Sequence, residues 1–144
     1  MVDLSKLVEY DRAHPVKIHT PNGDDVGITI YVVSQDSKRV VDALRENQAE
    51  VWSKEAAGEE KRFVDVVADR SRAILIHSID SWDWGEQTFG HLGEGAECSV
   101  ENREFLIDHP NAAWIRDQIA EGCATLANFT SGSPKNARRG SKRT

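Results

Sequence analysis

Histidine, cysteine and paired acidic side chains are the residues of this chain that could bind a metal ion or perform acid–base catalysis. None of its five histidines stands at metal-ligand spacing, and neither His91 nor His109 combines with Cys98 into a zinc-binding pattern. Asp80 and Asp83 could form a carboxylate pair, but no positioned base or nucleophile accompanies them. We therefore expect a protein without enzymatic activity, catalytic residues, metal site or cofactor.

Aromatic side chains offer a different chemistry, the binding of another protein. The segment 80–98 is rich in glycine and carries Trp82, Trp84 and Phe89, and tryptophan is enriched among the residues that anchor protein interfaces. The glycines do not form a phosphate-binding loop, because no Gly-Lys-Ser/Thr accompanies them. These rings either contact a partner or fold back over the neighbouring helices.

A second set of candidate contacts lies near the C-terminus, on a helix expected over residues 111–129. Apolar and small residues recur there at spacings of four and three, which places Ile115, Ile119, Gly122, Leu126 and Phe129 on one helical face. This apolar stripe either enters the protein's own core or occupies a partner's groove. The candidate partner contacts of the chain are therefore Trp82, Trp84, Phe89, Trp114, Ile115, Ile119, Leu126 and Phe129.

Two kinds of element must position these residues. An alternating apolar–polar run, an Asn-Gly turn and a run rich in β-branched residues predict a β-hairpin over residues 15–33. Apolar residues at helical spacing predict four helices, over about residues 37–57, 59–79, 99–108 and 111–129. The expected fold is α+β and mostly α. It is one domain, residues 1–130, in which the N-terminal hairpin packs on a bundle of about four helices.

Charge is distributed unevenly along the chain. The last ten residues carry five positive charges and no acid, and because the net charge of the whole chain is −6, the rest carries −11. We expect residues 131–144 to be a disordered, flexible basic tail. The acidic body makes nucleic acid an unfavourable main partner. No apolar run approaches the roughly 18 residues that span a bilayer, and the N-terminus has no secretory signal, so we expect no membrane partner.

Several short motifs occur in a fixed order along residues 15–130. The N-terminal motifs surround the predicted hairpin and the step into the first helix, and they comprise Val16, Ile18, Pro21, Gly23, residues 27–30, Asp36 and Ser37. A tryptophan follows the helices, and the C-terminal motifs comprise Ser99, Glu101, Asn102, Pro110, residues 114–119 and residues 127–129. With these motifs the chain resembles the tail assembly chaperones of long-tailed, siphovirus-like bacteriophages. It departs from the family pattern in its Asn-Gly-Asp-Asp turn, in Asp117 where Glu is commoner, and in Ala112 and Ala113.

The resemblance implies a chaperone that binds the tape measure protein, keeps it soluble and helps recruit tail tube subunits. It further implies a protein of the host cytoplasm that is absent from the mature virion, and it leaves self-association open. Two other functions remain as alternatives. One is a structural tail or connector subunit that stays in the virion and pairs through the edge of its β-hairpin. The other is a small nucleic-acid-associated regulator that uses the basic tail.

Overall fold

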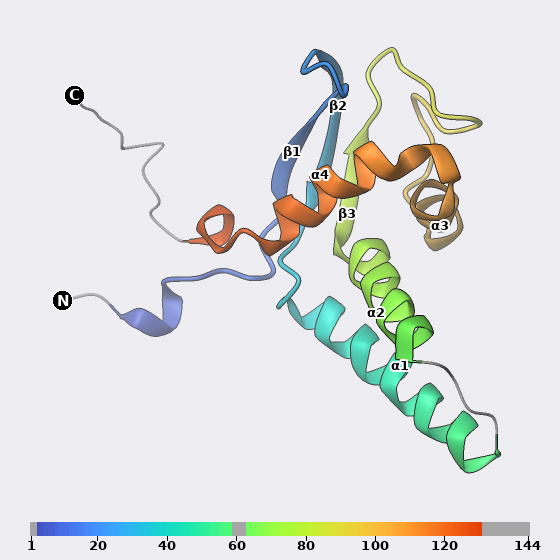
Figure 1. The fold of residues 1–144 in the computed structure, drawn as a ribbon. Helices are drawn as coiled ribbons and strands as arrows, with labels where there is room; N and C mark the ends of the chain where they lie inside the picture. Colours follow the sequence, from blue (N-terminus) through green and yellow to red (C-terminus); the bar gives the residue numbers. More distant parts are fainter. Residues whose placement is uncertain (1–2, 59–62, 131–144) are drawn as a thin grey trace.

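The computed structural model describes residues 3–58 and 63–130 of the 144-residue chain. Within these residues there are four α-helices and a three-stranded antiparallel sheet, which confirms the α+β, mostly helical fold with N-terminal strands (Figure 1). The expected basic tail over residues 131–144 lies outside the described residues, as does the expected start of the second helix at residues 59–62.

The elements follow one another in nearly the predicted order. They are the 3-10 turn η1 (Leu4–Lys6), strands β1 (His14–His19) and β2 (Asp25–Val32), helices α1 (Lys38–Ala56) and α2 (Phe63–Ser78), strand β3 (Ile79–Asp83), helix α3 (Val100–Asp108), the 3-10 turn η2 (Pro110–Ala112), helix α4 (Ala113–Ala124) and the 3-10 turn η3 (Leu126–Phe129).

The predicted β-hairpin is formed by β1 and β2. The turn contains Gly23 at a φ of +93°, a conformation that glycine adopts without steric cost, and the Thr20 N–H donates to the Asp24 carbonyl at 2.8 Å. Ile18 of β1 is paired with Ile28 of β2, and both are buried. The alternation seen in the sequence therefore places its apolar residues on the core face of the sheet.

Strand β3 is a correction to the sequence prediction, which extends a helix to residue 79 and assigns residues 80–98 to a loop. Helix α2 instead ends at Ser78, whose hydroxyl donates to the Leu75 carbonyl at 3.0 Å, and β3 pairs with β2. Two of the five residues of β3 are aspartates, which are poor strand formers. Its β-structure therefore comes from pairing with β2, a long-range contact that local sequence patterns do not reveal.

The core of the molecule lies between the sheet and α4, which packs against β1 and β2 (Figure 1). Ile115 and Ile119 of α4 and Ile18 of β1 have almost no exposed surface. Gly122 lets the helix approach the sheet closely, because a Cβ atom at this position would lie 2.5 Å from Val16 Cγ2. A glycine is therefore required where α4 crosses β1.

Helix α4 is shorter than the predicted 111–129, which is a second correction. It ends at Ala124, and Thr125 follows in an extended conformation with φ −82° and ψ 104°. A β-branched residue with a hydroxyl that bonds a preceding carbonyl weakens a helix at this point. As a result Leu126 leaves the apolar stripe and is 53% exposed, whereas Phe129 is fully buried.

Helices α1 and α2 form an antiparallel hairpin whose connecting end points away from the sheet (Figure 1). Helix α2 also packs on α3, α4 and β3 near its C-terminus, whereas the main neighbour of α1 among the described elements is α2. The far half of this helical hairpin therefore has no third layer over it in the described part of the chain.

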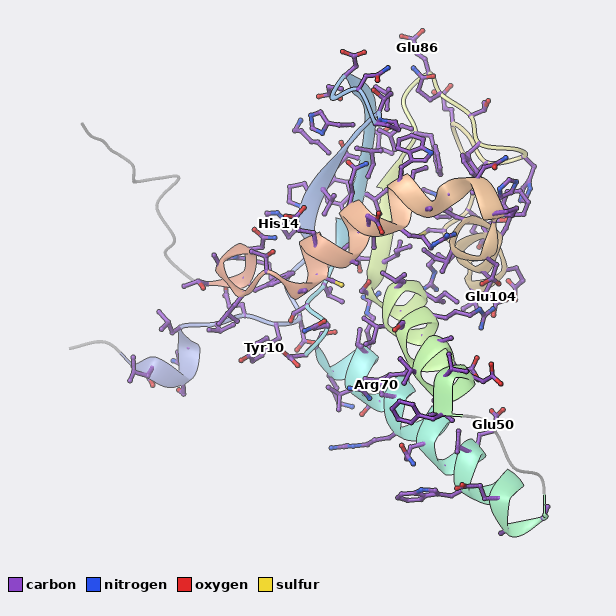
Figure 2. The ribbon with its side chains drawn as sticks, in the orientation of Figure 1. Tyr10, His14, Glu50, Arg70, Glu86 and Glu104 are labelled. Carbon is purple, nitrogen blue, oxygen red and sulfur yellow. The ribbon has the colours of Figure 1, made fainter. Side chains whose placement is uncertain are left out.

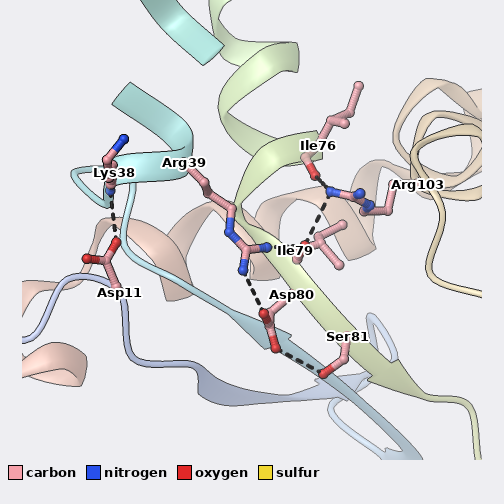
Figure 3. A network of polar contacts seen from close by, with 8 residues as sticks. All are labelled: Asp11, Lys38, Arg39, Ile76, Ile79, Asp80, Ser81 and Arg103. Carbon is pink, nitrogen blue, oxygen red and sulfur yellow. Dashed lines mark hydrogen bonds and ion pairs between the residues drawn. The ribbon is translucent and has the colours of Figure 1, made fainter. Parts of the chain in front are cut away.

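Polar contacts fix the base of the helical hairpin to the rest of the molecule (Figure 3). Asp11 accepts a hydrogen bond of 2.9 Å from the backbone N–H of Lys38, so that an acid remote in sequence caps α1. Arg39 forms an ion pair of 2.7 Å with Asp80 of β3. Arg103 of α3 donates to a carbonyl in the last turn of α2 at 2.8 Å. Among the described residues, these polar anchors of the hairpin therefore lie at its base.

Candidate interaction surface

The predicted contacts on the C-terminal helix are mostly part of the core. Ile115, Ile119 and Phe129 are at most 1% exposed, Trp114 is half-buried, and Leu126 points to solvent. The sequence leaves two alternatives open for this stripe, the protein's own core or a partner's groove. Ile115, Ile119 and Phe129 lie in the protein's own core. A partner would reach them only if α4 left the sheet.

Both tryptophans of the glycine-rich segment fold back onto the body. Trp84 is 2% exposed, and Trp82 is half-buried and donates its indole N–H to the Ala96 carbonyl at 2.9 Å. The two rings meet edge to face with centroids 5.6 Å apart. Phe89 is half-buried, and its ring lies 4.9 Å from that of His109. These three aromatic residues therefore pack the segment against the neighbouring elements.

The polar residues of the C-terminal motifs bind backbone groups. Arg116 donates to the carbonyls of Ile107 and His109, at 2.9 and 2.8 Å, and so joins α4 to the end of α3. The Asn128 side chain donates to the Gly122 carbonyl at 3.0 Å, near the end of α4. The residues that carry the family resemblance in this region therefore hold the fold together.

The outer edge of β1 is largely occupied by the protein's own groups. The Gln118 side chain accepts from the N–H of His19 and donates to its carbonyl, both at 2.8 Å. Alternate residues of a strand present their backbone groups to the same edge, so Lys17 and Pro15 share it. The Lys17 carbonyl accepts from His19 Nδ1 at 3.0 Å, and Pro15 has no N–H to offer. Addition of a strand here is unfavourable.

Exposed apolar side chains gather instead at the far end of the α1–α2 hairpin. Phe63 is 82% exposed and Trp52 is 64% exposed, and Val64 and Val67 are also exposed. Clustered apolar side chains in contact with water mark surfaces that bind partners. We call these four residues the hairpin tip.

A groove between α1 and α2 leads from the body toward the hairpin tip. Its volume is about 400 Å³, and its lining includes Val41, Leu44, Gln48, Arg70 and Ile74. Figure 2 labels Arg70 on this hairpin together with Glu50, which lines a separate, more acidic groove. Three of the eight residues that line the first groove are apolar, and the other five are charged or carry an amide.

Helical spacing places three tip residues on the same face as this groove. Trp52 follows Gln48 by four residues, and Val67 and Phe63 precede Arg70 by three and seven residues. Groove and tip together extend over twelve residues of α1, from residue 41 to residue 52, a rise of about 17 Å. We call this continuous face the hairpin surface.

Arg72 links α2 to α3 at the base of the hairpin. Its guanidinium donates to both carboxylate oxygens of Asp108, at 2.7 and 2.9 Å, and to Glu104 at 3.3 Å. The hydrogen bond from Arg72 holds the pKa of Asp108 below its ordinary value, and the same contact raises the pKa of Arg72. The pair is therefore charged at neutral pH.

Burial shifts the pKa values of the side chains that could otherwise act in catalysis. It lowers the pKa of His77 and raises the pKa of the Cys98 and Cys123 thiols, so the neutral form of each is favoured. Across residues 3–58 and 63–130, no group of three or more histidine, cysteine or acidic side chains is arranged to hold a metal ion. In the same residues, every helix is too short or too polar to cross a membrane.

Sequence reasoning did not single out the hairpin tip. The sequence predicts a bundle of about four helices packed with the β-hairpin, and none of the candidate partner contacts lies on the first two helices. Element length is the signal that could have found the tip. Helix α1 has 19 residues, about 29 Å, whereas α3 and α4 have 9 and 12 residues, about 14 and 18 Å. The short helices cannot cover the long one.

We compared the chain with protein-family models, curated proteins and solved structures. No protein-family model, no curated protein and no solved structure matches it.

Proposed function

We propose that this protein is a phage tail assembly chaperone, which binds the tape measure protein in the host cytoplasm, keeps it soluble and helps recruit tail tube subunits. Two lines of support meet here. One is the ordered set of motifs that the chain shares with this family. The other, which carries the choice of site, is the hairpin surface, where a groove that contains Val41, Leu44 and Ile74 leads to two exposed aromatic rings.

The hairpin surface suits an amphipathic helix as its ligand. Such a helix places apolar residues along one face at spacings of three and four, and a groove between two helices accepts that face as a third helix. A surface about 17 Å long corresponds to about three turns of bound helix. The family resemblance supplies the client, because tape measure proteins are long, helical and rich in apolar residues.

Charge supports the chaperone's second task, which is to keep the complex dispersed. The chain without its last ten residues carries a net −11. A client coated with such acidic proteins would repel other coated clients, and this repulsion opposes aggregation of the apolar helices.

The structure of β1 weighs against the main alternative, a virion subunit that pairs through its hairpin edge. Gln118 occupies both backbone groups of His19, and Pro15 removes a donor from the same edge. A strand from another subunit would have to displace these bonds, whereas a helix can bind the hairpin surface without displacing any secondary structure.

Co-expression with the tape measure protein of the same phage tests the proposal. We expect the tape measure protein to be insoluble alone and soluble with this chain, and we expect mass spectrometry of purified virions to find no copies of the chain. A tape measure protein that stays insoluble, or abundant copies of the chain in the virion, would contradict the chaperone function.

A further inference from the structure

We infer that the hairpin surface also binds a second copy of this chain, so that two copies pair through their α1–α2 hairpins when no client is present. Two antiparallel helices form a single layer, and the apolar face of such a layer is buried when another helix pair packs on it. The result is a four-helix arrangement with two-fold symmetry. That a second copy and the tape measure protein compete for the hairpin surface rests on the proposed function. The pairing of two copies does not.

Net charge favours the hairpin as the place where two copies meet. The whole chain carries −6, so two copies repel each other at most relative orientations. Helix α1, however, contains four basic and four acidic residues, and α2 contains two of each with histidine counted as neutral. The helical hairpin is therefore a neutral region of an acidic protein, and its approach to a copy of itself meets little repulsion.

The order of charges along the groove favours an antiparallel pair. Arg45 lines the groove on the body side of Trp52, and Glu55 lies beyond Trp52 on the same helical face, ten residues or about 15 Å from Arg45. We place the two-fold axis of the pair midway between Arg45 and Glu55, so that the two α1 helices run antiparallel. Each Arg45 then lies opposite the Glu55 of the other copy. The Arg45 side chain is largely exposed, and its ion pair with Asp42 is long, at 3.8 Å. It can therefore turn toward a carboxylate of the other copy.

The same overlap brings the exposed rings of each copy into the groove of the other. Trp52 and Phe63 together would bury about 300 Å² per copy. A stable interface buries about 800 Å² per partner, and Val67 and the stems of the charged side chains supply part of the remainder. We therefore expect a dissociation constant in the micromolar range, weak enough for a client to displace the copy.

Sedimentation of the full chain over about 1 to 200 µM tests the pairing. We expect a monomer–dimer equilibrium, and we expect Phe63→Glu to raise the dissociation constant by at least roughly 30-fold, because it places a charge in the apolar contact. Leu126→Glu is the matched control, since Leu126 is an exposed apolar residue on η3, outside the hairpin, and it should leave the constant unchanged. A monomer at every concentration, or a dimer that survives Phe63→Glu, would overturn the inference.

A charge exchange tests the antiparallel geometry. Arg45→Glu and Glu55→Arg should each weaken the dimer by about 3- to 10-fold, because a symmetric interface contains the pair twice. The double variant should recover most of the wild-type affinity, and a double variant weaker than both single ones would overturn the geometry. If the chain is a monomer but still keeps the tape measure protein soluble, the pairing is overturned and the proposed function stands. If the chain is a dimer but does not keep the tape measure protein soluble, the proposed function is overturned and the pairing stands.

Discussion

The sheet with α4 and the far half of the α1–α2 hairpin differ in what surrounds their apolar side chains. Phe129 is enclosed by strands and helices and has no exposed surface, whereas Phe63 is 82% exposed at the end of a helix pair without a third layer among the described residues. Both regions contain amphipathic helices. Amphipathicity alone therefore does not separate a core face from a binding face; the presence of a covering layer does.

The two phenylalanines provide the largest expected contrast. Phe129→Ala should lower the free energy of unfolding by about 3–5 kcal/mol, since it removes a fully buried ring and leaves a cavity. Phe63→Ala should change it by less than about 0.5 kcal/mol, because the ring is already in water. Urea denaturation of both variants measures the difference, and equal losses would mean that the hairpin tip is covered in the free protein.

Gly122→Ala should destabilise the protein by about 2 kcal/mol. The new Cβ would lie 2.5 Å from Val16 Cγ2, and the cost of this overpacking exceeds the gain of about 1 kcal/mol that alanine brings to a helix. Thermal denaturation measures the loss. The double variant with Gly122→Ala and Val16→Ala should lose less free energy of unfolding than the sum of the two single losses. A stabilised Gly122→Ala variant would contradict the close crossing of α4 over β1.

Gln118→Ala should cost about 1 kcal/mol, because it leaves two backbone groups of His19 without their side-chain partner. It should also open the edge of β1 and increase association of the protein at high concentration. Light scattering before and after heating measures that association. If Gln118→Ala stays as soluble as the wild type, the side chain is not needed to protect the edge.

The ion pair between Arg72 and Asp108 should give the smallest effect. Because the folded-state pKa of Asp108 is lowered, the stability that this pair provides is present above pH 3.8 and is lost as the pH falls through the lowered value. Asp108 is nearly half exposed, so Asp108→Asn should cost only about 0.5 kcal/mol at pH 7, and the difference from wild type should shrink as the pH falls through the lowered pKa of Asp108. A loss unchanged by pH, or unaffected by molar salt, would contradict an electrostatic origin.

The elements with strong local patterns could be predicted from the sequence. The Asn-Gly turn with its flanking β-branched runs specified the hairpin of β1 and β2, and Ser99 marked the start of α3, where its hydroxyl accepts from the Asn102 N–H at 3.2 Å. Strand β3 was missed because its five residues form a strand only through pairing with β2. The end of α4 was missed because Thr125 breaks a stripe whose spacing continues unchanged to Phe129.

The candidate surface was harder to predict than the fold. Sequence patterns show that Ile119 and Phe63 both lie on apolar helical faces, but they do not show which face another element covers. That outcome depends on the tertiary arrangement, in which α4 lies on the sheet and α1 and α2 extend beyond the short helices. Trp84 illustrates the same limit, since its residue type is typical of interfaces and the fold places it in the core.

Photo-cross-linking during co-expression with the tape measure protein tests the central claim most directly. A photoreactive phenylalanine analogue in place of Phe63, at the hairpin tip, is compared with the same analogue in place of Leu126, which is also exposed but lies on η3. We predict a covalent adduct with the tape measure protein from position 63 and none from position 126. An adduct from position 126 alone would contradict the assignment of the α1–α2 hairpin as the client-binding surface.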